Sequence, residues 1–176
     1  MRNDLPEIVD LWQLAAVGGR LKGTLPLQRM LRLKPLLASA AGDVAIDLRG
    51  GTDDQARAFI SGRLNAHVEM ICQRCMLATA IPIAVDFRLV LAHSEEQAAA
   101  LPKQCDPLVA PESGSSVVEL GEDELILALP IVPMCDNPQR CGYKPPNNVV
   151  KTSKASKPFA ILESLLDGSK LNDSNT

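Results

Sequence analysis

The chain has 176 residues, and 46% of them are hydrophobic although only 3% are aromatic, so a single domain can bury a core of Leu, Ile, Val and Ala. The formal net charge of −3 excludes a basic surface over the whole protein and leaves only local basic patches for contacts with nucleic acid. No apolar run approaches the roughly 18 residues of a membrane span, and the N-terminus lacks the pattern of a signal peptide. We therefore expect a soluble cytoplasmic protein that contacts no membrane.

The first half of the chain predicts a helix and then three strands. Residues 6–18 carry apolar side chains at helical spacing, with Pro in the first turn and two glycines at the end, and predict a short amphipathic helix. Residues 43–49, 57–72 and 79–92 alternate apolar and polar side chains, which is typical of strands buried on one face, and residues 50–54 predict a turn. Alternation of this length favours an antiparallel meander with one face in water.

Residues 27–41 are apolar with basic residues interspersed, namely Arg29, Arg32 and Lys34. Pro35 argues against one unbroken helix in this segment. The basic side chains suit either a phosphate-contacting patch or the solvated face of a helix. The sequence favours the solvated face.

The second half begins with a short polar helix over residues 94–100, followed by a long loop to Ser116. Residues 117–120 predict a strand, and residues 122–129 predict a helix. The three acidic residues that open this helix are expected to stabilise the positive end of its dipole. Pro130 ends the helix, and an extended segment leads to Cys135.

These elements predict an α+β fold, an antiparallel β-sheet meander covered by a few short helices, with a flexible C-terminal tail. Residues 1–142 are expected to form a single globular domain, residues 143–158 a polar, basic linker, and residues 159–176 a short amphipathic helix and a disordered end. The apolar face of that helix is predicted to dock on a partner protein or on its own domain, the two being equally favoured. Its anchors are Phe159, Leu162 and Leu165.

The cysteines give the main candidate site. Cys72 and Cys75 have C-x2-C spacing and lie in the turn between two predicted strands, while Cys135 and Cys141 lie in a loop sixty positions further on. Two turns that each supply two sulfurs are typical of a structural zinc site. Packing of Cys72 as a small apolar residue is the alternative. Thiol redox chemistry is less favoured, because redox C-x-x-C pairs normally open a helix, and Cys105 has no assigned role.

The sequence contains no pattern of catalysis. It lacks a phosphate-binding glycine loop, an H-E-x-x-H motif and a G-x-S-x-G motif. We therefore expect that the protein is not an enzyme and has no small-molecule substrate.

Four segments in order resemble the YceD family, the large ribosomal RNA subunit accumulation proteins of bacteria. Residues 72–75 are similar to the family's C-Q-R-C signature, and residues 122–133 are similar to its E-D-E-x-x-L-A-L-P-x-x-P segment. Residues 20–26 resemble its N-terminal segment. Residues 157–162 resemble its N-P-F-A-x-L tail, with Lys157 in place of Asn.

The resemblance implies a cytoplasmic, non-enzymatic role in ribosome biogenesis, in making or stabilising 23S rRNA. The implied partners are ribosomal RNA and a ribosomal or assembly protein. Family members can carry His in place of Cys135, an exchange that suits a zinc ligand. For RNA contact we predict Arg74 and Arg140, which lie beside the paired cysteines, and Lys144. The alternatives are a protein-interaction module without RNA contact and a redox-responsive thiol protein.

Overall fold

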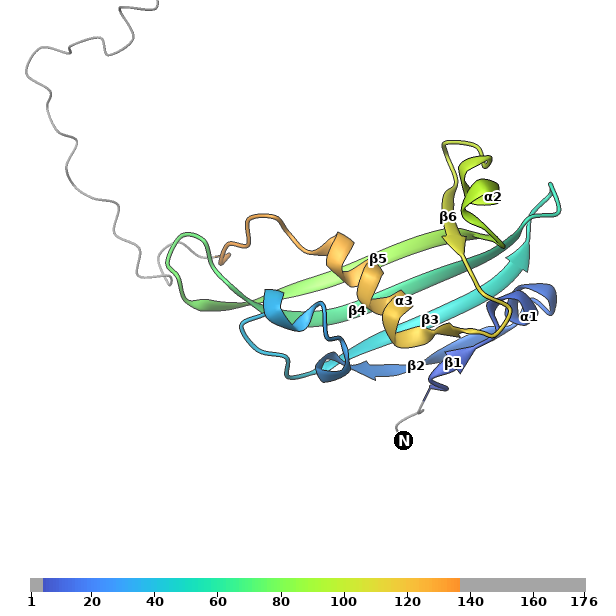
Figure 1. The fold of residues 1–176 in the computed structure, drawn as a ribbon. Helices are drawn as coiled ribbons and strands as arrows, with labels where there is room; N and C mark the ends of the chain where they lie inside the picture. The colour runs from blue at the N-terminus through green and yellow to red at the C-terminus, as the bar shows by residue number, and fades with distance from the viewer. Residues whose placement is uncertain (1–4, 137–176) are drawn as a thin grey trace, which may run out of the picture. The chain divides into compact units, whose positions relative to one another are not determined.

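The computed structural model describes residues 5–136 (Figure 1). Its main element is a five-stranded sheet in the order β2-β3-β4-β5-β6. The first four strands are antiparallel neighbours, and β6 is parallel to β5. The strands are β2 (Arg20–Pro26), β3 (Asp43–Thr52), β4 (Ala58–Ile71), β5 (Ala78–Ala92) and β6 (Asp106–Val109). The predicted α+β fold with an antiparallel meander is confirmed, and the parallel edge strand is an addition.

The remaining elements are short. Two residues of β1 (Ile8–Val9) pair with β7 (Ser115–Ser116) in a second, two-stranded sheet. The helices are α1 (Leu11–Ala16), α2 (Glu95–Ala99), α3 (Val117–Ala128) and the 3₁₀ turns η1 (Leu27–Arg29) and η2 (Lys34–Leu36). Among the described residues, no helix is long and apolar enough to cross a membrane.

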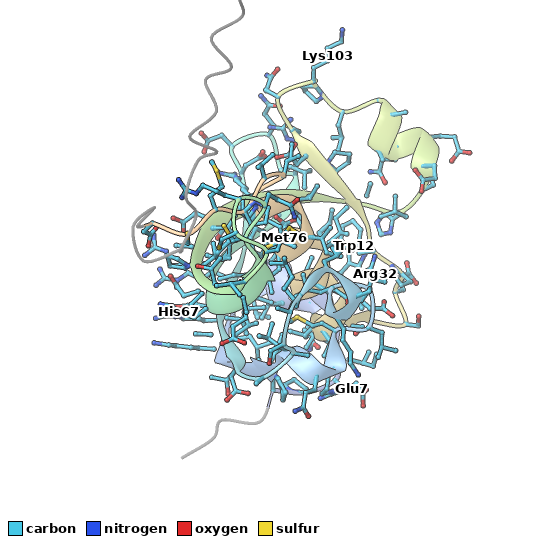
Figure 2. The ribbon with its side chains drawn as sticks, turned by 90° about the vertical axis from the view of Figure 1, so that its left-hand side faces the viewer. Glu7, Trp12, Arg32, His67, Met76 and Lys103 are labelled. Carbon is cyan, nitrogen blue, oxygen red and sulfur yellow. The ribbon has the colours of Figure 1, made fainter. Side chains whose placement is uncertain are left out.

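Within the part of the chain that the structure describes, helices cover only one face of the sheet. In Figure 1, α3 lies along this face, and a view along the strands shows Trp12 and Arg32 on the helical side and His67 on the other (Figure 2). Along β4 every second residue is buried, including Gly62, Leu64 and Val68. The buried side chains of the sheet, α1 and α3 form one core of aliphatic residues, so the predicted wet face is also confirmed.

Three boundaries differ from the prediction because local hydrogen bonds or close packing decide them. The first helix is shorter, since the Asp10 carboxylate accepts the N–H of Gln13 at 2.9 Å and caps it there. Strand β3 runs through the predicted turn, because Gly50 lies against α1, where a Cβ would be 2.2 Å from the Leu14 carbonyl oxygen. The turn follows at Asp53, whose carboxylate accepts two backbone N–H groups.

Helix α3 begins five residues earlier than predicted, and the expected strand over residues 117–120 is wrong. The hydroxyl of Ser116 caps the helix by accepting the N–H of Glu119 at 3.2 Å. Glu122 therefore lies in the second turn, where it is 3% exposed, and not in the first turn as a dipole-stabilising residue.

Candidate metal centre

The turn between β4 and β5 places Cys72 and Cys75 side by side. Cys72 continues the buried face of β4 and is fully buried, as its phase in the strand predicts. The turn is closed by two backbone bonds of 2.9 Å, from the Cys72 N–H to the Leu77 carbonyl and from the Met76 N–H to the Cys72 carbonyl. Met76 takes a φ of 60° to allow this closure.

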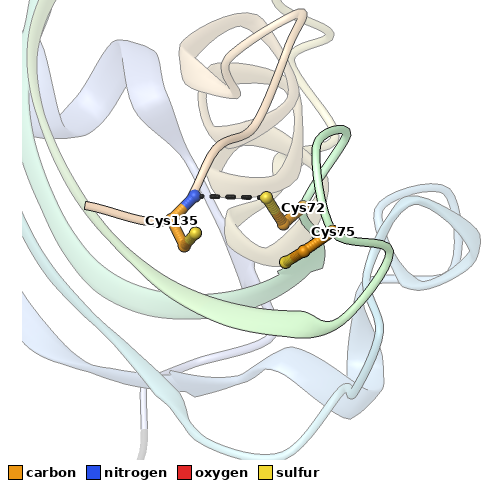
Figure 3. Close-up of side chains that lie close together, drawn as sticks. All are labelled: Cys72, Cys75 and Cys135. Carbon is orange, nitrogen blue, oxygen red and sulfur yellow. Dashed lines mark hydrogen bonds between the residues drawn. The ribbon is translucent and has the colours of Figure 1, made fainter. Parts of the chain in front are cut away.

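The segment after α3 brings a third cysteine to this turn. The N–H of Gln73 donates to the Pro133 carbonyl at 2.9 Å, and the Arg74 guanidinium donates to the Cys135 carbonyl at 2.8 Å. As a result the sulfur atoms of Cys72, Cys75 and Cys135 lie within 4.8 Å of one another (Figure 3). Residues more than sixty positions apart thus form one cluster at the end of the sheet.

Backbone N–H groups surround the Cys72 sulfur. Those of Cys135 and Arg74 each donate to it at 3.4 Å. Hydrogen bonds from the backbone N–H groups of Cys135, Cys75 and Arg74, in that order of size, stabilise the thiolate and lower the pKa of Cys72 to about 6. Burial opposes this shift. A thiolate held by N–H groups in a buried position is the state in which cysteine binds a metal.

The cluster has the dimensions of a metal site. Zn–S bonds of about 2.3 Å separate the sulfurs of a tetrahedral site by about 3.8 Å, which the observed limit of 4.8 Å accommodates. The three cysteines are therefore placed to hold one metal ion. Cys72 is buried and Cys75 and Cys135 are half-buried, an enclosure that suits a structural metal site. Cys105 lies apart from this cluster and contacts the Arg57 guanidinium at 3.5 Å.

The structure places only some of the predicted site residues. Arg74 is half-buried, and its guanidinium contacts both the carbonyl and the sulfur of Cys135. It therefore links the two cysteine-bearing segments. The remaining predicted residues lie outside the described residues, namely the ligand Cys141, the RNA contacts Arg140 and Lys144, and the partner contacts Phe159, Leu162 and Leu165.

Sequence reasoning missed the role of Glu122. One oxygen of its buried carboxylate accepts the N–H groups of Arg32 and Leu33 at 2.6 and 2.9 Å, and the other accepts the Arg32 side chain at 3.1 Å. Arg32 also pairs with Asp123 at 2.6 Å, and these carboxylates raise its pKa. Two carboxylates thus hold the Arg32 guanidinium, while the side chain remains 54% exposed. Glu122 fixes α3, which leads to Cys135, against the segment between η1 and η2.

Comparison with known proteins identifies the family. The sequence model described as "Large ribosomal RNA subunit accumulation protein YceD" matches residues 60–166 of this chain. The chain belongs to the YceD family. The match begins in β4 and includes the whole cysteine cluster, so the candidate metal centre lies in the part that defines YceD proteins.

A curated relative extends the match toward the N-terminus. The "Large ribosomal RNA subunit accumulation protein YceD" of Haemophilus influenzae (strain ATCC 51907 / DSM 11121 / KW20 / Rd) is 29% identical over 140 residues, which cover 76% of this chain and 80% of the relative. No solved structure matches this YceD chain.

Proposed function

We propose that this protein is a cytoplasmic, non-enzymatic factor of ribosome biogenesis that promotes the synthesis, processing or stability of 23S rRNA. The observation that carries the proposal is its membership of the YceD family. The relative from Haemophilus influenzae, named for large ribosomal RNA subunit accumulation, supports it. The partners are then ribosomal RNA and a ribosomal or assembly protein.

Zinc is the metal that fits the cysteine cluster best. Its donor atoms are thiolate sulfurs, which select soft or borderline metals, and structural zinc sites use four such ligands in a closed tetrahedron. Cys141 follows Cys135 by six positions and is the fourth ligand in this proposal. The ion then fastens the β4–β5 turn to the segment after α3, which otherwise meet through a few hydrogen bonds.

The metal centre also provides a basic RNA contact in this proposal. Arg74 lies within the cluster, and Arg140 and Lys144 flank Cys141 in sequence. In this proposal the three positive charges outweigh the double negative charge of a zinc ion held by four thiolates, and give the cysteine region a small local excess of positive charge on a protein whose net charge is negative. Phosphate contacts of this kind weaken as salt concentration rises.

Depletion of the protein from its native host is expected to lower the ratio of 23S to 16S rRNA, and the wild-type gene should restore it. A gene encoding Arg74→Gln, Arg140→Gln and Lys144→Gln together should restore it less well at equal protein level, because the phosphate contacts are lost. The matched control removes one distant charge by Lys103→Gln and should act as wild type. An unchanged ratio after depletion contradicts the proposed function, and full rescue by the triple variant contradicts the assigned RNA contacts.

A protein-interaction module is the second candidate, favoured by exposed apolar side chains at the cysteine end. Ile131 is 98% exposed, Leu127 80% and Met76 67%. In this alternative the surface and the predicted anchors Phe159, Leu162 and Leu165 bind a ribosomal or assembly protein. Capture of that protein from lysate should survive nuclease treatment if the contact is direct, and its loss on nuclease treatment points to RNA as the bridge.

A further inference from the structure

The face of the sheet that no element of residues 5–136 covers carries a set of basic side chains far along the strands from the cysteine turn. Its outward side chains form rows across the strands, because directly paired residues point to the same side. One row pairs Arg20 with Arg49, Arg49 with Ser61, and Ser61 with Arg88. The next row alternates in charge. It contains Lys22, Asp47, Arg63 and Asp86.

These two rows hold five basic side chains against two acidic ones, on a protein whose net charge is −3. We call the five the basic face: Arg20, Lys22, Arg49, Arg63 and Arg88. The two acids pair with Arg20 and with Arg63. Among the described residues, Lys22 and Arg49 form no ion pair. The excess of positive charge is therefore local and is not neutralised within this face.

The first row is unfavourable for the fold itself. Arg20 and Arg49 are direct cross-strand partners, and like charges in that position destabilise a sheet. Arg20 turns to Asp47, which leaves Arg49 exposed with only a longer-range attraction to the same carboxylate and no ion pair of its own among the described residues. A pair of like charges that brings no gain in packing is expected at a surface that serves binding.

The basic face also has a hollow and a stacking platform. An open hollow of about 310 Å³ lies over Ser61, and its charged lining residues are Arg49 and Arg63 together with Asp47 and Asp86. Beside it the Arg88 guanidinium lies over the Phe59 ring, 3.8 Å from its centroid, and Arg88 is exposed. A planar guanidinium group can stack on an unpaired base, while neighbouring cations bind the phosphates of the same strand.

We propose that the basic face binds a single-stranded segment of RNA, with its phosphates on Arg49 and Lys22 and a base on Arg88. The inference rests on the proposed function, since it names a second surface by which the protein contacts ribosomal RNA. Charge complementarity supports RNA as the occupant in preference to protein. The side chains of the two rows are short or charged, with Phe59 as an aromatic neighbour, and most of the exposed large apolar residues lie at the cysteine end instead.

The test measures binding of the full chain to a labelled single-stranded RNA of about 12 nucleotides and to a duplex of the same length. A Lys22→Gln/Arg49→Gln variant is expected to bind the single strand about tenfold more weakly. Its slope of log K against log salt should be smaller by about 1.4, since each phosphate contact on a single strand contributes about 0.7. The matched control, Lys34→Gln/Lys103→Gln, removes the same charge from other surfaces and should keep the wild-type slope.

The outcomes separate this inference from the proposed function. Equal affinity and slope for wild type and the Lys22→Gln/Arg49→Gln variant would show that the basic face is not the RNA site, whether or not depletion lowers 23S rRNA. Tighter binding of the duplex would overturn the assignment to single strands. If the wild-type chain binds neither RNA yet restores 23S rRNA in the depleted host, the basic face is wrong and the protein-interaction alternative gains support.

Discussion

A Glu122→Ala variant is expected to lose about 3 kcal/mol of unfolding free energy, measured by denaturant unfolding. The carboxylate is buried and accepts two backbone N–H groups, from Arg32 and Leu33, together with the Arg32 side chain. Its removal leaves those N–H groups without their acceptor beside α3, and each such loss costs about 1–3 kcal/mol.

Two further variants identify which bonds matter. Glu122→Gln keeps an amide oxygen where one carboxylate oxygen accepts both N–H groups, so we expect a loss of only about 1 kcal/mol. Glu119→Ala makes the same truncation at an exposed position of the same helix and should cost less than about 1 kcal/mol. A loss from Glu122→Gln as large as that from Glu122→Ala would show that the ion pair with Arg32 dominates and not the backbone bonds.

Removal of the metal is expected to destabilise the domain by about as much as the Glu122→Ala substitution. Zinc at a free concentration about 100 times its Kd stabilises a folded site by about 2.7 kcal/mol, which for a domain of this size is a Tm change of roughly 10 °C. A strong chelator should therefore lower the Tm of the wild-type protein by about that amount. The Cys72→Ser variant should already melt at the lower temperature and should not respond to chelator.

The fifth cysteine provides the control for this experiment. Cys105 contacts Arg57 and lies apart from the cluster, so Cys105→Ser should melt as wild type does and respond to chelator in the same way. A wild-type Tm that is the same with zinc and with chelator would contradict the stabilising role of the metal.

The sheet could be predicted from the sequence because its signal is local. Alternation over residues 57–72 and 79–92 fixed both the pairing and the buried face, and it placed Cys72 inward. The C-x2-C turn followed from the position of Cys72 and Cys75 between those strands. The parallel strand β6 carried no such signal, since it has four residues, one of them Pro107, and depends on a distant partner.

The sequence does carry a local signal for the start of α3. Ser116 and Glu119 form the S-x-x-E pattern of a capping box, and the Ser116 hydroxyl does cap the helix. This start places Glu122 in the second turn and makes a buried role for it foreseeable. The contacts of Glu122 with Arg32 and Leu33 join residues about ninety positions apart. Spacing along the chain does not reveal such long-range contacts, nor the bond between Gln73 and Pro133 that brings Cys135 to Cys72.

The most direct measurement is the metal content of the natively purified, reduced protein, determined by elemental analysis together with Cys75→Ser and Cys105→Ser variants. The three adjacent sulfurs and the proposed fourth ligand predict one zinc ion per chain in the wild type and in Cys105→Ser, and its loss in Cys75→Ser. Wild-type protein that carries no metal when prepared without chelator would contradict a metal centre, and the cysteines would then be packing residues of the β4–β5 turn.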